Sequence, residues 1–181
     1  MKNQIKLFRK NGYILLNNVI SEKKCFFYKK KLNEYYDKYS KKYASDKNSN
    51  SLSNKVDEKV VYNLHNKDYF WFELFEHKKI KAILDVLLKD GSYENNEPYY
   101  LANISARCPL KFNKGQQLHV DSNLPGVNYN LSVNVLWMMD DFTSYNGSTR
   151  IVPGSHIVKK YAVNGKVCLL YTSDAADEWL R

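Results

Sequence analysis

A histidine and an aspartate, His119 and Asp121, stand two residues apart in the run QLHVD. Side chains of an extended segment alternate between its two faces, so both of these side chains would point the same way. An imidazole and a carboxylate on one face can take neighbouring positions around a metal ion. A second histidine would complete the ligand set of the non-haem Fe(II) oxygenases, which leaves positions open for substrate chemistry. The pair alone is a weak signal, because most such pairs are surface polar residues.

The residues after this pair have the pattern of two strands joined by a tight turn. Residues 131–142 (LSVNVLWMMDDF) predict a long strand, and residues 148–152 (STRIV) predict the strand that returns beside it. Asn146-Gly147 between them is a dipeptide typical of tight hairpin turns, and residues 153–156 (PGSH) predict a loop. Trp137 falls on the same face of the first strand as Val133, Val135 and Met139, where it could simply be a core aromatic.

The elements that must position these residues are mostly helices, followed by strands. Gly12 ends a short predicted helix over residues 3–10, and Ser21 is a plausible N-cap of a helix running to about Tyr39. That helix carries an apolar stripe at helical spacing, which we interpret as core packing. Further helical segments are predicted over 68–75 and 80–88, strands over 13–16, 59–64 and 99–106, and a polar loop over 41–55. This order favours an α+β arrangement with helices against an antiparallel sheet.

At this point the chain resembles a known family. HVD at 119–121, followed by VNVLWMMDDFTSYNGSTRIVPGSH at 133–156, is similar to the phytanoyl-CoA dioxygenase-like (PhyH-like) family of Fe(II)/2-oxoglutarate oxygenases. LFRKNGYILLNNVISEKK at 7–24 resembles the opening helix, strand and helix of that family. The resemblance runs from about Leu7 to about Lys159, with a gap in the Ser/Asn-rich loop. Its specific part is the run N-G-S-T-x-x-V-P-G-S-H at 146–156.

The resemblance implies a fold, a reaction and a site. The fold would be a double-stranded β-helix (jelly roll, cupin-like) buttressed by the N-terminal helices. His119 and Asp121 would be catalytic residues that bind Fe(II), with 2-oxoglutarate as co-substrate, molecular oxygen as oxidant and a small molecule as substrate. Trp137 would line the co-substrate pocket. Because Asp121 fills the position that related iron halogenases leave open for halide, the resemblance favours hydroxylation.

The last residues of the chain differ from the rest. Residues 168–178 (CLLYTSDAADE) resemble the translation of a sequencing-library adapter, and residues 168–181 contain neither lysine nor asparagine, which are abundant before them. We therefore expect residues 1–167 to be a partial oxygenase domain, residues 168–181 to be non-native, and the natural protein to continue beyond Val167. The jelly roll would then be incomplete at its C-terminus, since such a fold has about eight strands.

The family's second iron-binding histidine and its 2-oxoglutarate-binding arginine would lie on late strands that this chain lacks. His156 follows Asp121 by too few residues for a strand to return beside the first ligand, and the family resemblance places this histidine in a loop. His65 and His77 have no ligand partner at suitable spacing. We therefore expect the chain as it stands to be an inactive fragment.

Composition limits the other functions. The chain has 181 residues with 44% hydrophobic content, enough for one domain with a core. It has no apolar run long enough to cross a membrane and no signal-peptide pattern. Three scattered cysteines indicate a reducing compartment, which predicts a cytoplasmic protein without a zinc site.

The net charge of +9 comes almost entirely from lysine, without an arginine-rich stripe, so we expect neither nucleic acid nor membrane as a partner. A basic protein associated with nucleic acid is the weaker hypothesis. A non-catalytic, cupin-like domain that binds a small molecule is the main alternative to the enzyme. The substrate and the oligomeric state are not determined by the sequence.

Overall fold

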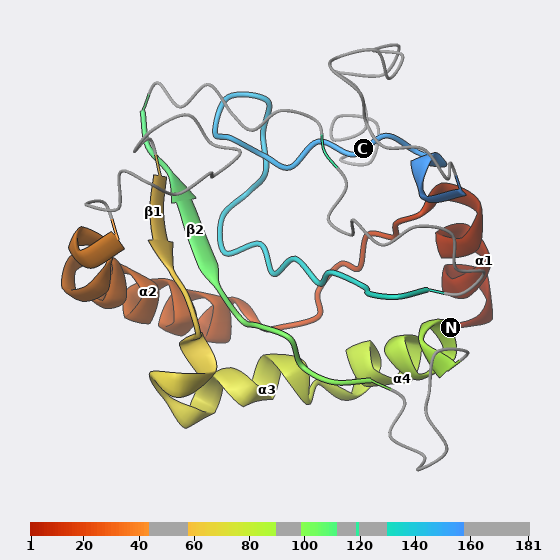
Figure 1. Ribbon diagram of the computed structural model, residues 1–181, viewed down its shortest axis with the longest axis horizontal. Helices are drawn as coiled ribbons and strands as arrows, with labels where there is room; N and C mark the ends of the chain where they lie inside the picture. Colours follow the sequence, from red (N-terminus) through yellow and green to blue (C-terminus); the bar gives the residue numbers. More distant parts are fainter. Residues whose placement is uncertain (44–57, 90–98, 112–118, 120–129, 158–181) are drawn as a thin grey trace.

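The computed structural model describes residues 1–43, 58–89, 99–111, 119 and 130–157 (Figure 1). Four α-helices, two short strands and three 3-10 turns make up the regular structure of these residues. The α-helices are α1 (Lys2–Asn11), α2 (Glu22–Tyr43), α3 (Phe72–Phe75) and α4 (Lys78–Leu87), and the strands are β1 (Glu58–Val61) and β2 (Ala106–Pro109). The 3-10 turns are η1 (Leu64–Asn66), η2 (Tyr69–Trp71) and η4 (Ser155–Ile157). The predicted α+β class is confirmed at this level. Among the described residues, no helix is long and apolar enough to cross a membrane.

Helix α1 ends where the sequence predicted. Gly12 adopts a left-handed conformation with φ of 83°, and its backbone N–H donates to the carbonyl of Phe8 at 2.7 Å. Glycine adopts this conformation without the steric penalty that a Cβ brings. The chain therefore turns sharply after α1, and the next residues run back across the helices.

Helix α2 begins directly after Ser21, as predicted, and continues to Tyr43 rather than to about Tyr39. The Ser21 hydroxyl accepts a hydrogen bond from the backbone N–H of Lys24 at 3.3 Å, which satisfies a donor that the first helical turn leaves open. The predicted core stripe of this helix is confirmed, because Tyr28, Leu32 and Tyr36 are buried.

The sheet of the described residues has two antiparallel strands, β1 and β2. Val61 pairs with Ala106, and both are buried against α2, which crosses one side of the pair (Figure 1). Arg107 and Glu58 form an ion pair at 2.6 Å near the other end of β1. The predicted strand at 59–64 is confirmed in position, whereas the strand predicted at 99–106 forms later, at 106–109.

Three clusters of apolar side chains form the core. The α2 cluster consists of Tyr28, Leu32, Tyr36, Val61, Leu64, Trp71, Leu74 and Ala106. The α1–α4 cluster consists of Ile5, Ile83 and Leu87, and the α4 cluster consists of Ile80, Leu84 and Leu88. Tyr28 stacks on Trp71 with ring centroids 5.2 Å apart, so the largest buried side chains join α2 to the η2 turn.

Residues 130–157 do not form the strands that the sequence predicted. No strand is assigned within this segment, at 131–142 or at 148–152, nor at 13–16 near the first helix. A strand requires a ladder of backbone hydrogen bonds to a neighbour, and alternating side chains alone do not provide one. Ile14 and Leu16 pack on the α1–α4 cluster instead of pairing in a sheet. The described residues therefore contain a two-stranded sheet but no jelly roll.

The predicted turn at Asn146-Gly147 is confirmed, although the strands beside it are not. Asn146 accepts a hydrogen bond from the backbone N–H of Thr143 at 3.0 Å, and Gly147 has a φ of 78°. A Cβ on Gly147 would lie 2.8 Å from Cγ of Pro109, so the turn packs closely on the end of β2. Glycine is required here both by the backbone angle and by the close contact.

Candidate functional site

The structure places two of the three predicted site residues. His119 is exposed, and Trp137 is half-buried in the segment that crosses the helices. Asp121 lies outside the described residues, so the predicted pairing of His119 with Asp121 stays a prediction. Among the residues that are described, no group of three or more His, Cys, Asp or Glu side chains is close enough to hold a metal ion.

Trp137 lies between two parts of the core. Its side chain packs against both the α2 cluster and the α4 cluster, and its ring meets the imidazole of His77 edge to face, with centroids 5.8 Å apart. Val133, on the same side of the segment, packs against the α4 and α1–α4 clusters. Val133, Trp137 and Met139 of the predicted inward face are half-buried, whereas Val135 of the same face is exposed, so the alternation is followed only in part without a paired strand.

His77 was not expected to act as a ligand, and its contact with Trp137 was not predicted from the sequence. It precedes α4 and its carbonyl accepts hydrogen bonds from the backbone N–H groups of Ile80 and Lys81, both at 2.9 Å. Its Nδ1 is buried, and no hydrogen-bond partner for this atom occurs in the described part of the chain. No local signal could have linked His77 to Trp137, because the two residues are far apart in sequence and lie in different elements.

Side chains from the helices hold the segment that carries Trp137. The Asn130 side-chain amide donates to the carbonyl of Leu87 at 2.7 Å, where α4 ends. The Cys25 thiol on α2 lies 3.5 Å from the carbonyl oxygen of Met139 and can donate to it. Lys29 on α2 forms an ion pair with Asp140. Helices α2 and α4 thus hold the chain before and after Trp137, at Asn130 and at residues 139–140 (Figure 1).

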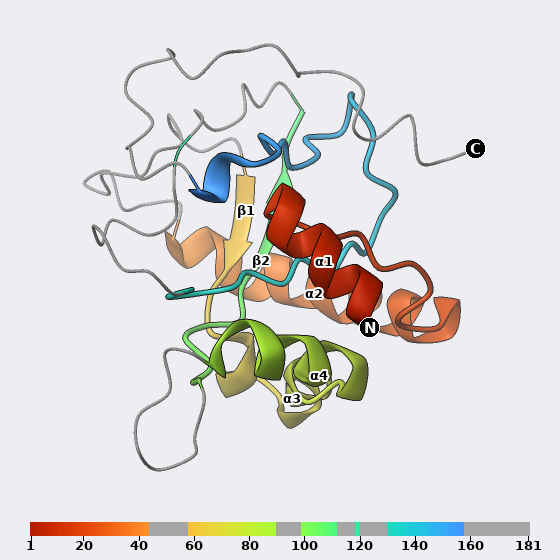
Figure 2. The ribbon, with the colours of Figure 1, turned by 90° about the vertical axis from the view of Figure 1, so that its right-hand side faces the viewer.

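His156 lies at the end of α1, on the η4 turn (Figure 2). Its Nε2 is 3.1 Å from the carbonyl oxygen of Arg9. Because a carbonyl oxygen only accepts hydrogen bonds, this contact requires a proton on Nε2. A histidine N–H at the C-terminal end of a helix satisfies a carbonyl that the helix leaves open. The arrangement engages His156 in the packing of the turn against α1.

The helix surface beside this segment carries a polar network around Glu73. Lys24 contacts the Glu73 carboxylate at 2.5 Å, and the Tyr28 hydroxyl donates to the same oxygen at 3.2 Å. The hydrogen bond from Lys24 lowers the pKa of Glu73 below its usual value. Burial, together with the negative charge of Glu73, raises the pKa of Tyr28 to about 12. Tyr28 therefore stays protonated over the physiological range and acts as a donor.

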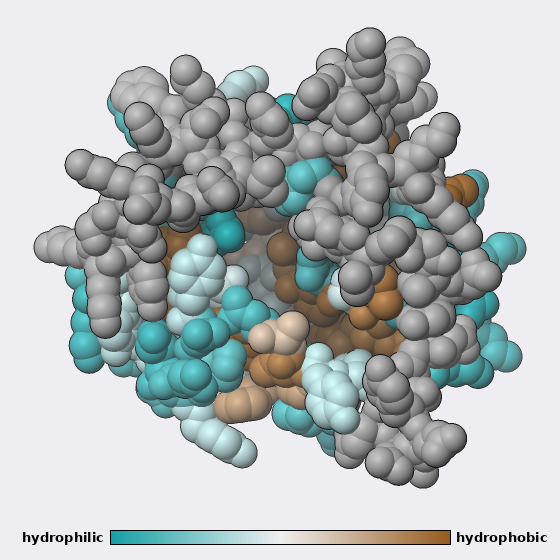
Figure 3. Space-filling view, viewed as in Figure 1, coloured by the Kyte–Doolittle hydropathy of each residue, from teal (hydrophilic) through white to brown (hydrophobic). Residues whose placement is uncertain are grey.

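The face that carries the segment is partly apolar at its surface. The exposed apolar side chains of residues 130–157 are Leu131, Val135, Leu136, Met138, Tyr145, Ile151 and Ile157. Figure 3 shows hydrophobic residues in the middle of this face, bordered by hydrophilic ones.

The donor types at the predicted site fit iron. An imidazole nitrogen and a carboxylate oxygen are the protein ligands of the two-histidine, one-carboxylate iron sites. His119, which would supply the imidazole, is exposed. The donor chemistry of the predicted pair is therefore compatible with Fe(II).

Comparison with known proteins identifies the class of this chain. A family model described as phytanoyl-CoA dioxygenase (PhyH) matches residues 8–168. Since this match covers most of the chain, the protein belongs to the phytanoyl-CoA dioxygenase family, and the predicted family is confirmed. The family is one of Fe(II)/2-oxoglutarate-dependent oxygenases and implies a cupin or jelly-roll fold. No curated protein and no solved structure shows a significant match to the chain.

Proposed function

We propose that the protein is an Fe(II)- and 2-oxoglutarate-dependent dioxygenase that hydroxylates a small-molecule metabolite. The observation that carries this proposal is the family match over residues 8–168, which spans the His119–Asp121 pair and the turn at 146–147. When bound, iron and 2-oxoglutarate would supply oxidative decarboxylation to succinate and carbon dioxide, coupled to hydroxylation of a substrate C–H bond. Oxygen and a small metabolite are the proposed partners, and we propose the cytoplasm as the compartment.

The roles of the chain's own residues follow from their chemistry. His119 would bind the metal through a neutral imidazole nitrogen, and Asp121 through its ionised carboxylate. Metal binding should therefore weaken as the pH falls and these groups take up protons. Trp137, held between the α2 and α4 clusters, would present an apolar wall to the co-substrate pocket. His77, in edge contact with Trp137, would restrict the rotation of that ring.

We also propose that the family's jelly-roll fold is incomplete in this chain and that the chain is inactive. All four histidines of the chain are at or before His156, so a second histidine ligand from a late strand is not in this sequence. Two ligands bind iron more weakly than three. We therefore propose that residues 1–181 bind Fe(II) weakly and do not form succinate.

The test is equilibrium dialysis of the full chain with Fe(II) and 2-oxoglutarate under anaerobic conditions. His119→Ala and Asp121→Ala should each remove the weak iron binding, whereas His65→Ala, the matched change at a histidine in the η1 turn, should not. Iron binding that neither His119→Ala nor Asp121→Ala alters would contradict the proposed ligands. Succinate formed above the no-protein control, and abolished by Asp121→Ala, would contradict the proposal that the chain is inactive but would leave the proposed ligands standing.

A long sequencing read through the source locus beyond the codon for Val167 separates the enzyme from the binding domain. A reading frame that continues and supplies a histidine, with an arginine downstream of it, would support the oxygenase. A gene that ends as the printed chain does would favour the non-catalytic, cupin-like binding domain.

A further inference from the structure

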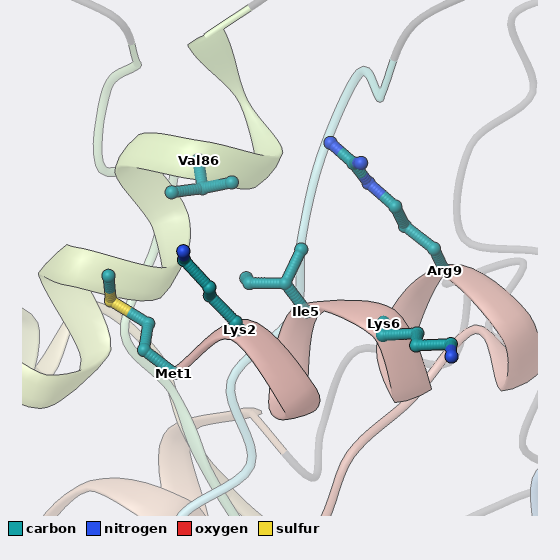
Figure 4. A pocket seen from close by; sticks show the side chains of 6 residues that line it. All are labelled: Met1, Lys2, Ile5, Lys6, Arg9 and Val86. Atoms are coloured by element: carbon teal, nitrogen blue, oxygen red, sulfur yellow. The ribbon is translucent and has the colours of Figure 1, made fainter.

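A groove of about 360 Å³ runs between α1 and α4. It is lined by Met1, Lys2, Ile5, Lys6, Arg9 and Val86 (Figure 4). A volume of this size falls at the lower end of the range for pockets that hold small molecules. None of the lining residues belongs to the segment that carries His119 or Trp137, so the groove is a separate feature.

The bottom of the groove is apolar. Ile5 is only 8% exposed and belongs to the α1–α4 cluster, and Val86 on α4 packs against the same cluster. Figure 4 shows Val86 facing Ile5 across the gap between the two helices. Met1 adds an apolar side chain at one end of the groove. A narrow apolar chain inserted here would remove these side chains from water.

The rim of the groove is cationic. Lys2, Lys6 and Arg9 are exposed and occur at spacings of four and three residues, which places them along one face of α1. Among the described residues, none of the three forms an ion pair, and helix α1 itself contains no acidic residue. Asp85 precedes the groove residue Val86 on α4, and its carboxylate accepts a hydrogen bond from the Tyr99 hydroxyl at 2.9 Å. The rim therefore has an excess of positive charge over an apolar floor.

We propose that this groove binds a small anionic amphiphile, with the apolar body against Ile5 and Val86 and the anionic head at the cationic rim, beside Arg9. The ligand class follows from charge complementarity and from the shape of the groove. Met1 at one end of the groove is exposed, but the floor residue Ile5 is recessed, which favours a ligand that enters the groove over a flat anionic membrane surface. The site goes beyond the proposed oxygenase function and requires neither iron nor 2-oxoglutarate.

The test uses octanoate as the probe and the uncharged 1-octanol as its control, with the full chain and isothermal titration calorimetry. Octanoate should bind with one-to-one stoichiometry and more weakly as salt is added, because ions screen exposed charges. Octanol should bind more weakly than octanoate at every salt concentration.

Two adjacent residues of α1 provide matched variants. Arg9→Gln removes a charge at the groove, and Lys10→Gln removes the same charge from an exposed residue of the same helix that does not line it. Glutamine favours helix about as well as the residues that it replaces, so both variants should fold. Arg9→Gln should weaken octanoate binding by about fivefold, the upper size expected of one exposed charge pair. Lys10→Gln should leave the affinity nearly unchanged.

Three outcomes would overturn the proposal. The first is equal binding of octanoate and octanol, and the second is an equal loss of affinity in Arg9→Gln and Lys10→Gln. The third is cosedimentation with vesicles that contain phosphatidylserine, but not with pure phosphatidylcholine vesicles, when octanoate does not bind. That last result would assign the basic face of α1 to an anionic membrane surface. Circular dichroism spectra of both variants confirm that each loss of binding occurs in a folded protein.

Discussion

The helical region, residues 1–89 as far as they are described, and the segment at 130–157 differ in how they are stabilised. In the described part of the chain, every fully buried apolar side chain lies between Ile5 and Ala106. The segment at 130–157 contains none, and its inward side chains, such as Trp137, are half-buried. The helical region therefore has its own core, whereas the segment takes its position from contacts with that core.

This difference matters for the candidate site. The helices of the first region provide the groups that hold the segment: the carbonyl of Leu87, the thiol of Cys25 and the ammonium group of Lys29. A change in the helical core should therefore affect both regions strongly, whereas a change in the segment should have a smaller effect on the stability of the protein. Four comparisons test this asymmetry, in order of decreasing expected effect.

The two tryptophans give the largest contrast. Trp71 is 1% exposed and stacks on Tyr28, so Trp71→Ala should lower the free energy of unfolding by about 3–5 kcal/mol through the cavity that it leaves. Trp137→Ala removes a half-buried ring and should cost less, about 1–2 kcal/mol. Urea unfolding followed by circular dichroism measures both. Equal costs would show that the two regions share a single core.

Gly12 lies where the two regions meet. Gly12→Ala should lower the free energy of unfolding by about 1–2 kcal/mol, because a residue with a Cβ is strained in the left-handed conformation. The loss should be larger still because this Cβ would lie 2.5 Å from Nδ1 of His156. Gly154→Ala is the matched control, since its φ of 76° is similar and no atom lies within 4 Å of its added Cβ. The difference between the two unfolding free energies measures the contact with His156. If both variants lost the same unfolding free energy, the η4 turn would be able to move away from the added Cβ of residue 12 without cost.

Ser21 tests the helical region by itself. Ser21→Ala removes the hydroxyl that accepts the Lys24 N–H and should lower the unfolding free energy by about 1 kcal/mol. Ser21→Asp, which keeps an acceptor and adds a negative charge at the helix N-terminus, should restore it. Urea unfolding of the three proteins provides the comparison. If the aspartate variant were as unstable as the alanine variant, the cap would not be the cause.

The smallest expected effect is a dependence on alkaline pH. Burial first, and then Glu73, raises the pKa of Tyr28 to about 12 from its ordinary value of 10.0. The unfolded chain therefore loses this proton before the folded chain does. The stabilisation is complete below about pH 10 and decreases as the pH rises toward about 12.

The Tyr28→Phe variant has no hydroxyl to ionise at this position. Its free energy of unfolding should therefore decrease less than that of the wild type between about pH 9 and about pH 11. Unfolding in urea at the two pH values measures the difference, and the titration of the lysines cancels in the comparison. Parallel losses in both proteins would indicate that Tyr28 ionises at its ordinary pKa.

The features predicted correctly from the sequence are local. Gly12 and Ser21 mark helix ends through their own backbone and side chain, and Tyr28 repeats at helical spacing with Leu32 and Tyr36. The turn at Asn146 is also determined within a few residues. Each of these needs no information from a distant part of the chain.

The features that the sequence missed depend on distant partners. Residues 131–142 have the alternation of a strand, but a strand also needs a paired neighbour, and the described neighbours of this segment are α2 and α4. The contact of Trp137 with His77 likewise joins two elements with no common local pattern. At the candidate site, the donor types of His119 and Asp121 could be predicted from the sequence, but their geometry could not. The family was recognised from the residues around both.

The contacts between α1 and the η4 turn have a consequence for the order in which the protein is completed. His156 meets the carbonyl of Arg9 across 147 residues, and the backbone N–H of Gly154 donates to the carbonyl of Asn11 at 2.7 Å. Synthesis proceeds from the N-terminus, so α1 leaves the ribosome long before these partners exist. Closing so large a loop is a late and slow event compared with helix formation. The contacts between the first helix and the η4 turn are therefore among the last to form.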